Sequence, residues 1–368
     1  MKKKNELAIF GGEKTIRLPF KKYNSIGDEE IKAVNKVMKS GELSKFIGAW
    51  HDDFLGGPKV RELELMVQEM FSVKHAISVN SWTSGLIAAV GSLEIEPQDE
   101  IILPAWTMSA CAASILHWNA LPVFADISPT SFNLDYKDVE KKITKRTKAI
   151  IAPDIFGQSA DLFNLKKLAR KYSIKIISDS AQAPYSEYKS KFTGTQSDIG
   201  GFSLNYHKHI NTGEGGIIVT NDKKLAERMQ LIRNHGESAV GGMKLKKINN
   251  LIGFNFRMGE IEAAIAIEQF KKLPEIVKHR QHMASILRDG LSELGGLKIP
   301  DEEISNTHVY YIFPMVLNLK LLKINRVKII KALEAEGVEG LMAGYQNLHL
   351  LPMFQKKIAY GNKGFPWP

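Results

Sequence analysis

The chain has 368 residues with an ordinary globular balance, 44% hydrophobic and 24% charged, and a formal net charge of +10. A chain of this length can bury a sizeable core and form two domains. Its single cysteine, Cys111, excludes an internal disulfide framework and is typical of a reducing compartment.

The amino-terminal segment MKKKNELAIFGGEKT is basic but lacks the apolar stretch of a signal peptide, and no apolar run nears the roughly 20 residues that span a bilayer. We therefore expect a cytoplasmic protein without membrane contact. The lysines are dispersed rather than gathered in a stripe with aromatic residues, so we expect no nucleic-acid partner. The positive charge still admits small anions such as nucleotides or sugar phosphates.

Between residue 73 and about residue 220, short β-type runs alternate with helical patterns. The predicted strands are HAISV, DEIILP, LPVFADI, KAIIAPDIF, IKIISDS, IGGFSLN and GGIIVT, and the predicted helices are SGLIAAVGSL, SACAASILHW and LFNLKKLARKY. This alternation predicts an α/β fold with a mostly parallel sheet and helices on both faces. Ligands of such sheets lie beyond the carboxyl ends of the strands, so polar residues that follow a strand are the first candidates.

A helix is predicted from about Arg257 to Leu291, followed by a strand, VYYIFPMVL, and a helix, NRVKIIKALEAEGV. This change of pattern predicts a large domain over residues 1–270, with an amino-terminal arm, and a small α+β domain over residues 271–368.

The segment NSWTSGLIAAV joins a predicted strand to a predicted helix through a turn rich in Ser and Thr. Free N–H groups at a helix start and neighbouring hydroxyls suit a phosphate group. Thr83 and Ser84 are the candidate ligands, and Ser203 is a third. Thr83 is equally suited to be an ordinary helix N-cap.

Asp179 follows a predicted buried strand in IISDSAQA, and Lys208 follows another in GFSLNYHKHINTGEGG. Taken singly, Asp179 could be a helix cap and Lys208 a solvated surface lysine. Together they match the needs of pyridoxal phosphate, whose aldehyde forms a Schiff base with a lysine and whose ring nitrogen is kept protonated by a carboxylate.

The neighbouring histidines and glycines have plainer interpretations. His207 and His209 would point to one face of a strand, a spacing that can bind metal, but no further ligands cluster nearby in the sequence and we expect no metal. The run GEGG lacks the pattern of a phosphate-binding loop and favours a turn that leads into GGIIVT.

The motifs DSAQA, GTQSDIGGFS, KHINTGEGG and GFNFRMGEIEAAI, in this order and spacing, resemble the DegT/StrS family of sugar aminotransferases, from ELAIFGGEKTI to NLHLLPMF. The resemblance implies a fold-type I enzyme that depends on pyridoxal phosphate, with a seven-stranded sheet in its large domain. It also implies a homodimer with shared active sites.

Carried over by position, the resemblance makes Lys208 the lysine that binds the cofactor and moves the proton, and Asp179 the partner of the ring nitrogen. Gln182 would contact the 3-hydroxyl, while Ser203, Thr83 and Ser84 would hold the phosphate. Asn255 would reach the cofactor of the neighbouring subunit. His207 and His349 are candidates for contact with the substrate.

Three departures from the family pattern stand out. Trp82 replaces the usual glycine of the phosphate turn, which would be strained if that position needed a positive φ. Met108 occupies the position of the usual ring-stacking aromatic, so Trp106 and Trp82 become candidates to replace it, the alternative being that both fill the core. The chain stops at GFPWP, where relatives continue, so we expect a truncated small domain, the alternative being a minimal one.

The implied reaction transfers an amino group, with glutamate as the expected donor, to a keto or aldehyde carbon of a sugar. The acceptor is either a nucleotide-linked keto sugar or, since NSWTSGL and FSLNYHKH resemble that branch, an eight-carbon keto acid that yields 8-amino-3,8-dideoxy-octulosonate for lipopolysaccharide. Two alternatives remain: a pyridoxal phosphate-dependent sugar dehydratase, in whose relatives histidine replaces the lysine, and a non-catalytic regulatory relative.

Overall fold

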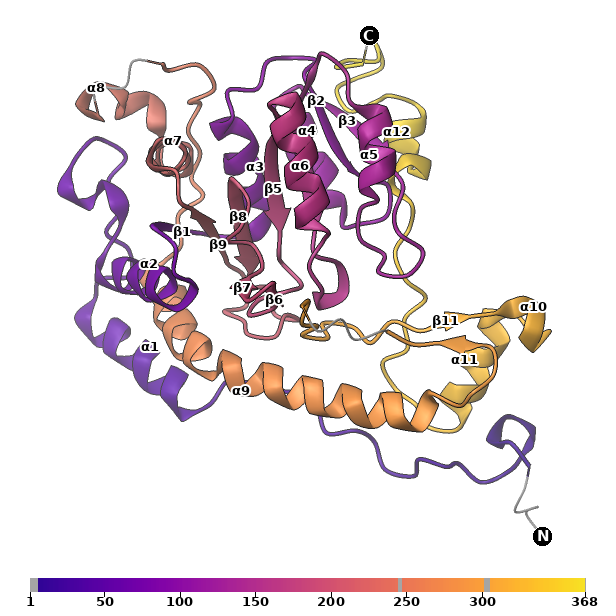
Figure 1. Cartoon of the computed structure of the whole chain (residues 1–368). Coiled ribbons are helices and arrows are strands. Elements are labelled where there is room, and N and C mark those ends of the chain that lie inside the picture. Colours follow the sequence, from indigo (N-terminus) through magenta and orange to yellow (C-terminus); the bar gives the residue numbers. More distant parts are fainter. Residues whose placement is uncertain (1–5, 244–246, 301–304, 368) are drawn as a thin grey trace.

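The structure is a computed structural model of the chain, and it describes residues 6–243, 247–300 and 305–367 (Figure 1). Its centre is a seven-stranded sheet in the order β1-β9-β8-β5-β4-β2-β3. These strands are β1 (His75–Val79), β2 (Glu100–Pro104), β3 (Leu121–Ala125), β4 (Thr147–Pro153), β5 (Lys175–Asp179), β8 (Ile199–Ser203) and β9 (Gly216–Thr220). The sheet confirms the predicted α/β fold and all seven predicted strands.

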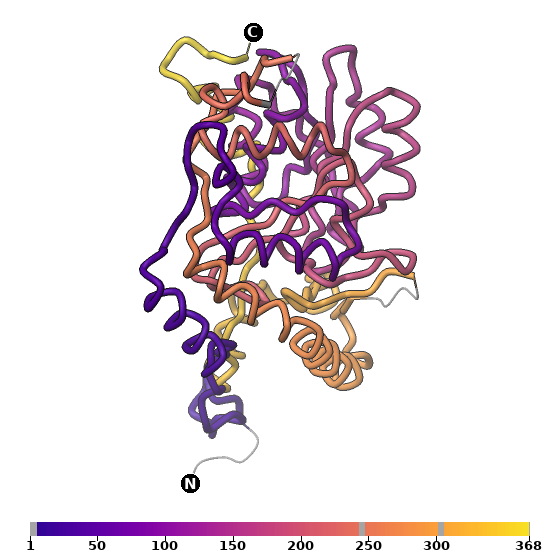
Figure 2. The backbone as a smooth tube through the Cα atoms, turned by 90° about the vertical axis from the view of Figure 1, so that its left-hand side faces the viewer, coloured from indigo at the N-terminus to yellow at the C-terminus, as the bar shows by residue number. Residues whose placement is uncertain are grey.

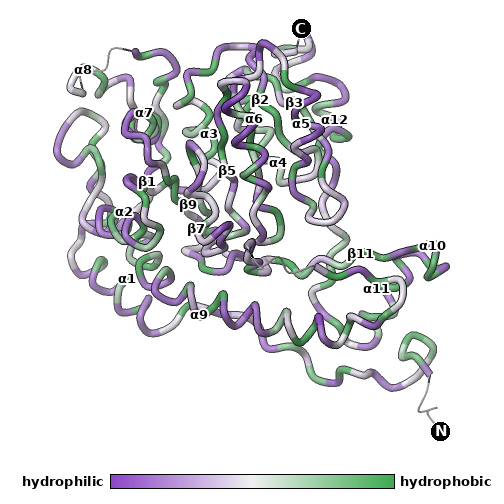
Figure 3. The backbone as a smooth tube through the Cα atoms, viewed as in Figure 1, coloured by the Kyte–Doolittle hydropathy of each residue, from purple (hydrophilic) through white to green (hydrophobic). Residues whose placement is uncertain are grey.

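Only β9 runs against its neighbours, because it pairs antiparallel with both β1 and β8 while the remaining pairs are parallel. The strands are short runs of Ile, Val, Leu and Ala that are buried on both faces, as parallel strands between helices must be. The hydrophobic residues along them are visible in Figure 3. The carboxyl ends of β1, β4, β5 and β8 therefore meet at one edge of the sheet.

Helices cover both faces of the sheet. One face packs against α3 (Trp82–Ser92), α4 (Ser109–His117) and α7 (Lys223–Arg233). The other packs against α2 (Pro58–Phe71), α5 (Tyr136–Lys142), α6 (Leu162–Tyr172) and the first half of α9 (Glu260–Leu291). The remaining helices are α1 (Asp28–Ser40), α8 (Val240–Met243), α10 (Leu319–Leu322), α11 (Arg326–Ala335) and α12 (Pro352–Gln355), with short 3-10 turns at Ala8–Phe10, Asp52–Leu55, Ile155–Gly157, Gly236–Ser238 and Leu348–Leu350.

The long helix α9 leads from the large sheet to a small unit that contains α10, α11 and the two-stranded ribbon of β10 (Leu297–Lys298) and β11 (Val316–Leu317) (Figure 1). A second ribbon, β6 (Glu187–Tyr188) with β7 (Lys191–Phe192), belongs to the large unit. The predicted division at residue 270 falls inside α9, which continues through it to Leu291, and that division stays a prediction.

The predicted strand VYYIFPMVL is wrong over most of its length, because only Val316 and Leu317 form a strand. Tyr310 has a left-handed backbone, with φ of 49°. The amides of Val309 and Ile312 donate to carbonyls of the turn after β4 rather than to a strand partner. The apolar side chains of this segment therefore cover the end of the sheet without extending a sheet.

Both terminal segments of the described chain contact parts of the structure that are distant in the sequence. The arm before α1 passes below α9 (Figure 1) and reaches the end of the molecule opposite the carboxyl terminus (Figure 2). Along the arm, the Thr15 hydroxyl donates to the Glu336 carboxylate over 2.8 Å and the Tyr23 hydroxyl donates to the carbonyl of His209 over 2.7 Å. Residues 348–367 return to the β3 edge, where the ring centroid of Phe354 lies 5.2 Å from that of Phe124. Among the described residues, no helix combines the length and apolarity needed to cross a membrane.

Candidate active site

Lys208 lies in the turn after β8, at the edge where the parallel strands end. Its side chain is 8% exposed, and its Nζ is 4.5 Å from the ring centroid of Tyr311. Within the described ranges, this amine has neither a hydrogen bond nor an ion pair. Burial lowers the pKa of Lys208 to about 8, although the charge of Asp179 acts in the opposite direction. The turn thus presents a buried lysine whose amine is free to react.

Asp179 is the last residue of β5, and its carboxylate accepts hydrogen bonds from two unusual donors. The Trp82 indole N–H donates to Oδ1 over 2.6 Å, and the Cys111 thiol donates to Oδ2 over 3.1 Å. Burial and the Asp179 charge raise the pKa of the Cys111 thiol well above its usual value, so the thiol stays a donor. These contacts fix the carboxylate in a site that is only 7% exposed.

Trp82 is the first residue of α3, and it has no positive φ. Its indole lies between α3 and the sheet, because neighbouring glycines leave room for it. A Cβ added at Gly201 would lie 2.0 Å from the Trp82 ring, and one added at Gly85 would lie 2.7 Å from it. A tryptophan at this position therefore causes no backbone strain. Its buried indole donates the hydrogen bond to Asp179.

The start of α3 has the features of a phosphate site. Ser81 caps the helix by accepting from the Ser84 amide over 3.1 Å, and the two serine hydroxyls are 2.9 Å apart. Thr83 is exposed, and the first turn contains no acidic residue. The first N–H groups of a helix lack partners within it and carry partial positive charge. Ser203, 7% exposed, ends the adjacent strand β8.

Gln182 joins the site to a distant part of the chain. Its Oε1 accepts from the amide of Phe156 over 2.8 Å, and its Nε2 donates to the Tyr345 hydroxyl over 2.7 Å. Phe156 has a left-handed backbone, with φ of 61°, which directs its amide to Gln182. Burial raises the pKa of Tyr345, so the hydroxyl that accepts from Gln182 remains protonated.

The candidates for a ring-stacking aromatic lie in different places. Trp106 packs against Phe132, Phe156 and Tyr345, and its indole N–H donates to the Tyr345 carbonyl over 2.7 Å. Met108 is 52% exposed. Trp106 and Gln182 thus both contact Tyr345, whereas Trp82 donates to Asp179 on the side of α3 that faces the sheet.

The two histidines beside Lys208 do not share a face, contrary to the strand-like interpretation of their spacing. His207 is exposed, while His209 is fully buried and bonded through Nε2 to the Val309 carbonyl over 2.8 Å. Residues 207–209 lie in a turn rather than in a strand. In the part of the chain that the structure describes, no group of three or more His, Cys, Asp or Glu side chains is arranged to hold a metal.

Two other candidates, Asn255 and His349, have no contact with Lys208 among those that the structure describes. Asn255 is exposed; its carbonyl accepts from the Asn80 side chain over 3.3 Å, and its Oδ1 accepts from the Arg257 side chain over 2.8 Å. It therefore lies beside the turn that precedes α3. His349 packs beside Phe124 of β3, with ring centroids 6.2 Å apart.

Sequence reasoning missed several residues of this region. Tyr311 and Tyr345 come from the carboxyl-terminal third, more than 100 residues after Lys208 in the chain, and no motif spacing links them to it. Cys111 was interpreted only as evidence against disulfides. Asp154, 1% exposed after β4, accepts from the Ser180 hydroxyl over 2.5 Å, and burial raises the pKa of Asp154 to about 7.

Comparisons with known proteins agree with this geometry. Residues 24–367 match the DegT/DnrJ/EryC1/StrS aminotransferase family. The chain belongs to this family. A curated relative, GDP-perosamine synthase of Caulobacter vibrioides, is 33% identical over 81% of this chain and 79% of its own.

Solved structures of family members have the same fold. The match to the structure of DesI in the presence of its TDP-sugar product covers 95% of this chain and 85% of the DesI chain, with a TM-score of 0.83 and 26% identity. A second match is to the Escherichia coli GDP-4-keto-6-deoxy-D-mannose-3-dehydratase with bound hydrated pyridoxal phosphate. It covers 86% of this chain and 83% of the dehydratase chain, with a TM-score of 0.76 and 25% identity. The fold-type I architecture is confirmed, and the chain is an aminotransferase of the sugar aminotransferase family that uses pyridoxal phosphate.

The donor set suits this cofactor. A buried amine without a hydrogen bond, a fixed carboxylate and a helix start without acidic residues match the aldehyde, the ring nitrogen and the phosphate, respectively.

The lowered pKa of Lys208 gives a testable pH dependence. Only the neutral amine attacks an aldehyde, and a pKa of about 8 leaves roughly one amine in ten neutral at pH 7, against fewer than one in a thousand at the ordinary pKa. In cofactor-free protein, the rate at which Lys208 captures pyridoxal phosphate should rise with pH and level off above about pH 8. Stopped-flow absorbance measures this rate, and a rise that continues to pH 10 would contradict the assigned pKa.

Proposed function

We propose that this enzyme transfers an amino group from an amino acid, glutamate being the expected donor, to a keto or aldehyde carbon of a sugar. The observation that carries the proposal is the buried, unbonded Lys208 amine on the same sheet edge as Asp179. Transamination needs a base that moves a proton between two carbons, and an amine with a pKa of about 8 is suited to that exchange near neutral pH.

The roles of the individual residues form part of the proposal. Bound pyridoxal phosphate supplies the electron sink that makes the amino-bearing carbon acidic. Lys208 would hold the cofactor through its Nζ, and the same nitrogen would accept the proton from the substrate carbon and return it. Asp179 keeps a positive charge on the ring nitrogen because the low-polarity site strengthens the attraction between them.

The remaining proposed contacts position the cofactor and the substrate. The start of α3, with Thr83 and Ser84, and the hydroxyl of Ser203 bind the phosphate. Gln182 contacts the 3-hydroxyl. Trp106 provides an aromatic surface next to Gln182. His207 and His349 are proposed to contact the sugar.

Dehydration is the competing proposal for this site. It is supported by the similarity to the E. coli dehydratase, but the lysine at position 208 favours transamination. A purely regulatory role is disfavoured, because Lys208, Asp179 and Gln182 are all present and buried.

We further propose a homodimer in which Asn255 of one subunit reaches the phosphate site of the other. This is supported by apolar side chains that lie exposed on the arm and near it, including Leu18 at 80%, Phe20 at 53% and Trp50 at 47%. We also propose a role in surface polysaccharide or lipopolysaccharide synthesis and a cytoplasmic location. The location is supported by the single cysteine, which is buried and unpaired, as is typical of a reducing compartment.

The reaction is tested with the cofactor-loaded enzyme, glutamate and a panel of acceptors. The panel contains UDP- and GDP-linked keto sugars and an oxidised octulosonate. We expect one acceptor class to gain an amine, seen by mass spectrometry, with one 2-oxoglutarate formed for each amine transferred. A product that has lost an oxygen and carries no amine would instead establish dehydration.

A further inference from the structure

A pocket of about 870 Å³ lies between the arm, α9 and residues 310–313. Tyr311 connects it with the active site, because this residue lines the pocket and its ring is 4.5 Å from the Lys208 Nζ. Tyr23 also lines the pocket and donates its hydroxyl to the carbonyl of His209, the residue after Lys208. The pocket and the Lys208 amine thus both contact the side chain of Tyr311.

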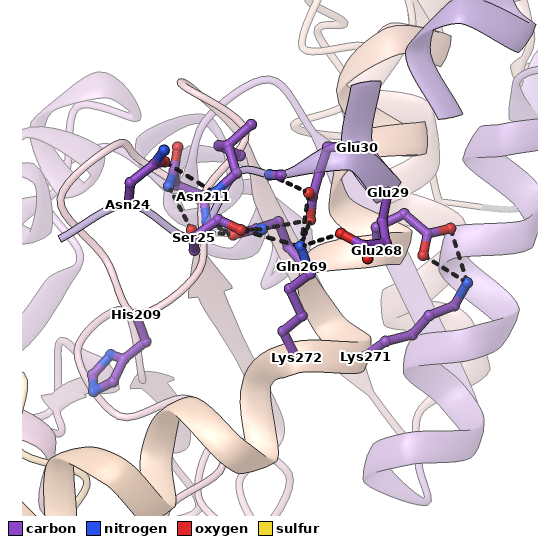
Figure 4. A network of polar contacts seen from close by, with 12 residues as sticks. Asn24, Ser25, Glu29, Glu30, His209, Asn211, Glu268, Gln269, Lys271 and Lys272 are labelled. Carbon is purple, nitrogen blue, oxygen red and sulfur yellow. Dashed lines mark hydrogen bonds and ion pairs between the residues drawn. The ribbon is translucent and has the colours of Figure 1, made fainter. Parts of the chain in front are cut away.

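Most of the positive charge around this pocket is already neutralised. Lys271 is paired with Glu268 at 2.8 Å, and Lys272 is paired with Glu29 at 3.2 Å and with Glu30 at 2.7 Å (Figure 4). Lys272 thereby ties α9 to α1, whereas the pair of Lys271 lies within α9. Both lysines have little charge left for a ligand.

Arg280 differs from these lysines. Its Nη1 donates to the Tyr310 carbonyl over 3.0 Å, and its guanidinium carbon is 5.5 Å from the Tyr23 ring centroid. No carboxylate among the described residues pairs with it. Glu275, also in the pocket lining, is exposed and precedes Arg280 by five positions, outside the spacings of three and four that bring helix side chains together.

A half-buried guanidinium without a counter-ion is costly, because burial removes water from the charge without replacing it by an opposite charge. A guanidinium has five N–H donors in a planar fork, which matches the two oxygens of a carboxylate or phosphate. The rest of the lining is largely apolar and includes Ile276, Met283 and Phe313, which suits the face of a sugar or base.

We propose that this pocket binds the acidic end of the sugar substrate, with Arg280 as the ligand of its oxyanion. The inference rests on the proposed function, because it assigns to this pocket the part of the sugar substrate that is remote from the reacting carbon. The reacting carbon lies at Lys208, and the acidic group lies beyond Tyr311. The group is either the diphosphate of a nucleotide-linked sugar or the carboxylate of a sugar acid, and both present the same oxyanion chemistry.

The test measures binding to the cofactor-loaded enzyme by calorimetry with UDP, GDP and 3-deoxy-octulosonate as probes. We expect at least one probe to bind the wild type, and Arg280→Gln to weaken it by roughly 10- to 100-fold, as loss of a charged hydrogen-bonding partner does. Arg280→Lys should fall between the two. A nucleotide probe would identify the diphosphate as the ligand, and the octulosonate would identify the carboxylate.

The matched control is Lys278→Gln, which removes one positive charge from an exposed position of the same helix outside the pocket lining. It should leave probe binding within about 3-fold, since exposed charges are screened. Equal weakening in both variants, or no probe binding to the wild type at millimolar concentration, would overturn the proposal.

The donor half of the reaction separates this inference from the proposed function. Arg280→Gln should leave the glutamate-driven change in cofactor absorbance within about 3-fold of wild type, because the pocket is assigned to the sugar. Loss of that change would show that the pocket holds the donor, and would overturn the assignment. A dehydrated product together with Arg280-dependent probe binding would refute transamination and leave the subsite in place.

Discussion

Lys208→Ala is expected to abolish the visible absorbance of covalently bound cofactor and to lower turnover by more than about 10³-fold. The variant loses both the amine that bonds the aldehyde and the base that moves the proton, and proton transfer alone typically contributes about 10²- to 10⁴-fold. Absorbance spectra of the purified variant and steady-state 2-oxoglutarate formation measure the two effects. A variant that retains undiminished turnover would refute the assigned role.

Unfolding should not account for this loss, because burying the lysine opposes folding. A pKa lowered from 10.5 to about 8 corresponds to about 3 kcal/mol of destabilisation, which applies in full below pH 8, where both states bind the proton. Between pH 8 and 10.5 the unfolded chain binds more protons than the folded one, so stability rises with pH. Lys208→Met should therefore stabilise the cofactor-free protein at pH 7 by about 1–3 kcal/mol in urea unfolding, and less at pH 10.

Asp179→Asn should lower kcat by about 10²- to 10³-fold and weaken cofactor binding. Asparagine preserves the shape of the side chain and can still accept from the Trp82 indole, so the main change is the loss of negative charge next to the ring nitrogen. Single-turnover absorbance with glutamate and equilibrium dialysis of pyridoxal phosphate separate the effects on chemistry and on binding. Activity within about 3-fold of wild type would show that this charge is not needed.

Asp154→Asn is the matched control, since Asp154 is equally buried at the end of the neighbouring strand β4. Burial already raises the pKa of Asp154 to about 7, so much of its charge is absent at neutral pH, and its oxygens are occupied by Ser180 and Ala160. We expect kcat to change by less than about 3-fold. A loss as large as that of Asp179→Asn would indicate a general effect of altering this edge.

Much of the large unit could be predicted from the sequence because its strands are short, apolar runs separated by helical periodicity. Seven predicted strands correspond to the seven of the sheet. The prediction of a strand at VYYIFPMVL failed because β-branched and aromatic side chains favour burial as well as strand formation. Here they cover the ends of the strands, and Tyr310 among them has a left-handed backbone.

The candidate site was predictable where motifs follow strands directly. Asp179 ends β5 and Lys208 follows β8, so the parallel pairing of these strands brings both residues to one edge. The contacts of Tyr311 and Tyr345 depend on how the carboxyl-terminal third folds back, and this has no local signal. The Trp82–Asp179 bond was missed for another reason: Trp82 was considered as a ring-stacking or core-filling side chain, and neither role indicates a hydrogen bond from its indole to Asp179.

The space around Trp82 links this residue and Gly85, both on α3, with the distant positions 179 and 201. The indole fits only while residues 85 and 201 have no side chain, and its N–H is satisfied only while residue 179 accepts it. Substitutions at positions 82 and 85 should be strongly non-additive, because alanine at Gly85 would clash with tryptophan yet fit once a smaller residue stands at 82. Alanine at Gly201 should not be rescued in this way, because its Cβ would also lie 2.3 Å from the backbone oxygen of Ile217. A chain with glycine at position 82 could thus acquire the indole only while residue 85 is also glycine, which orders the two substitutions.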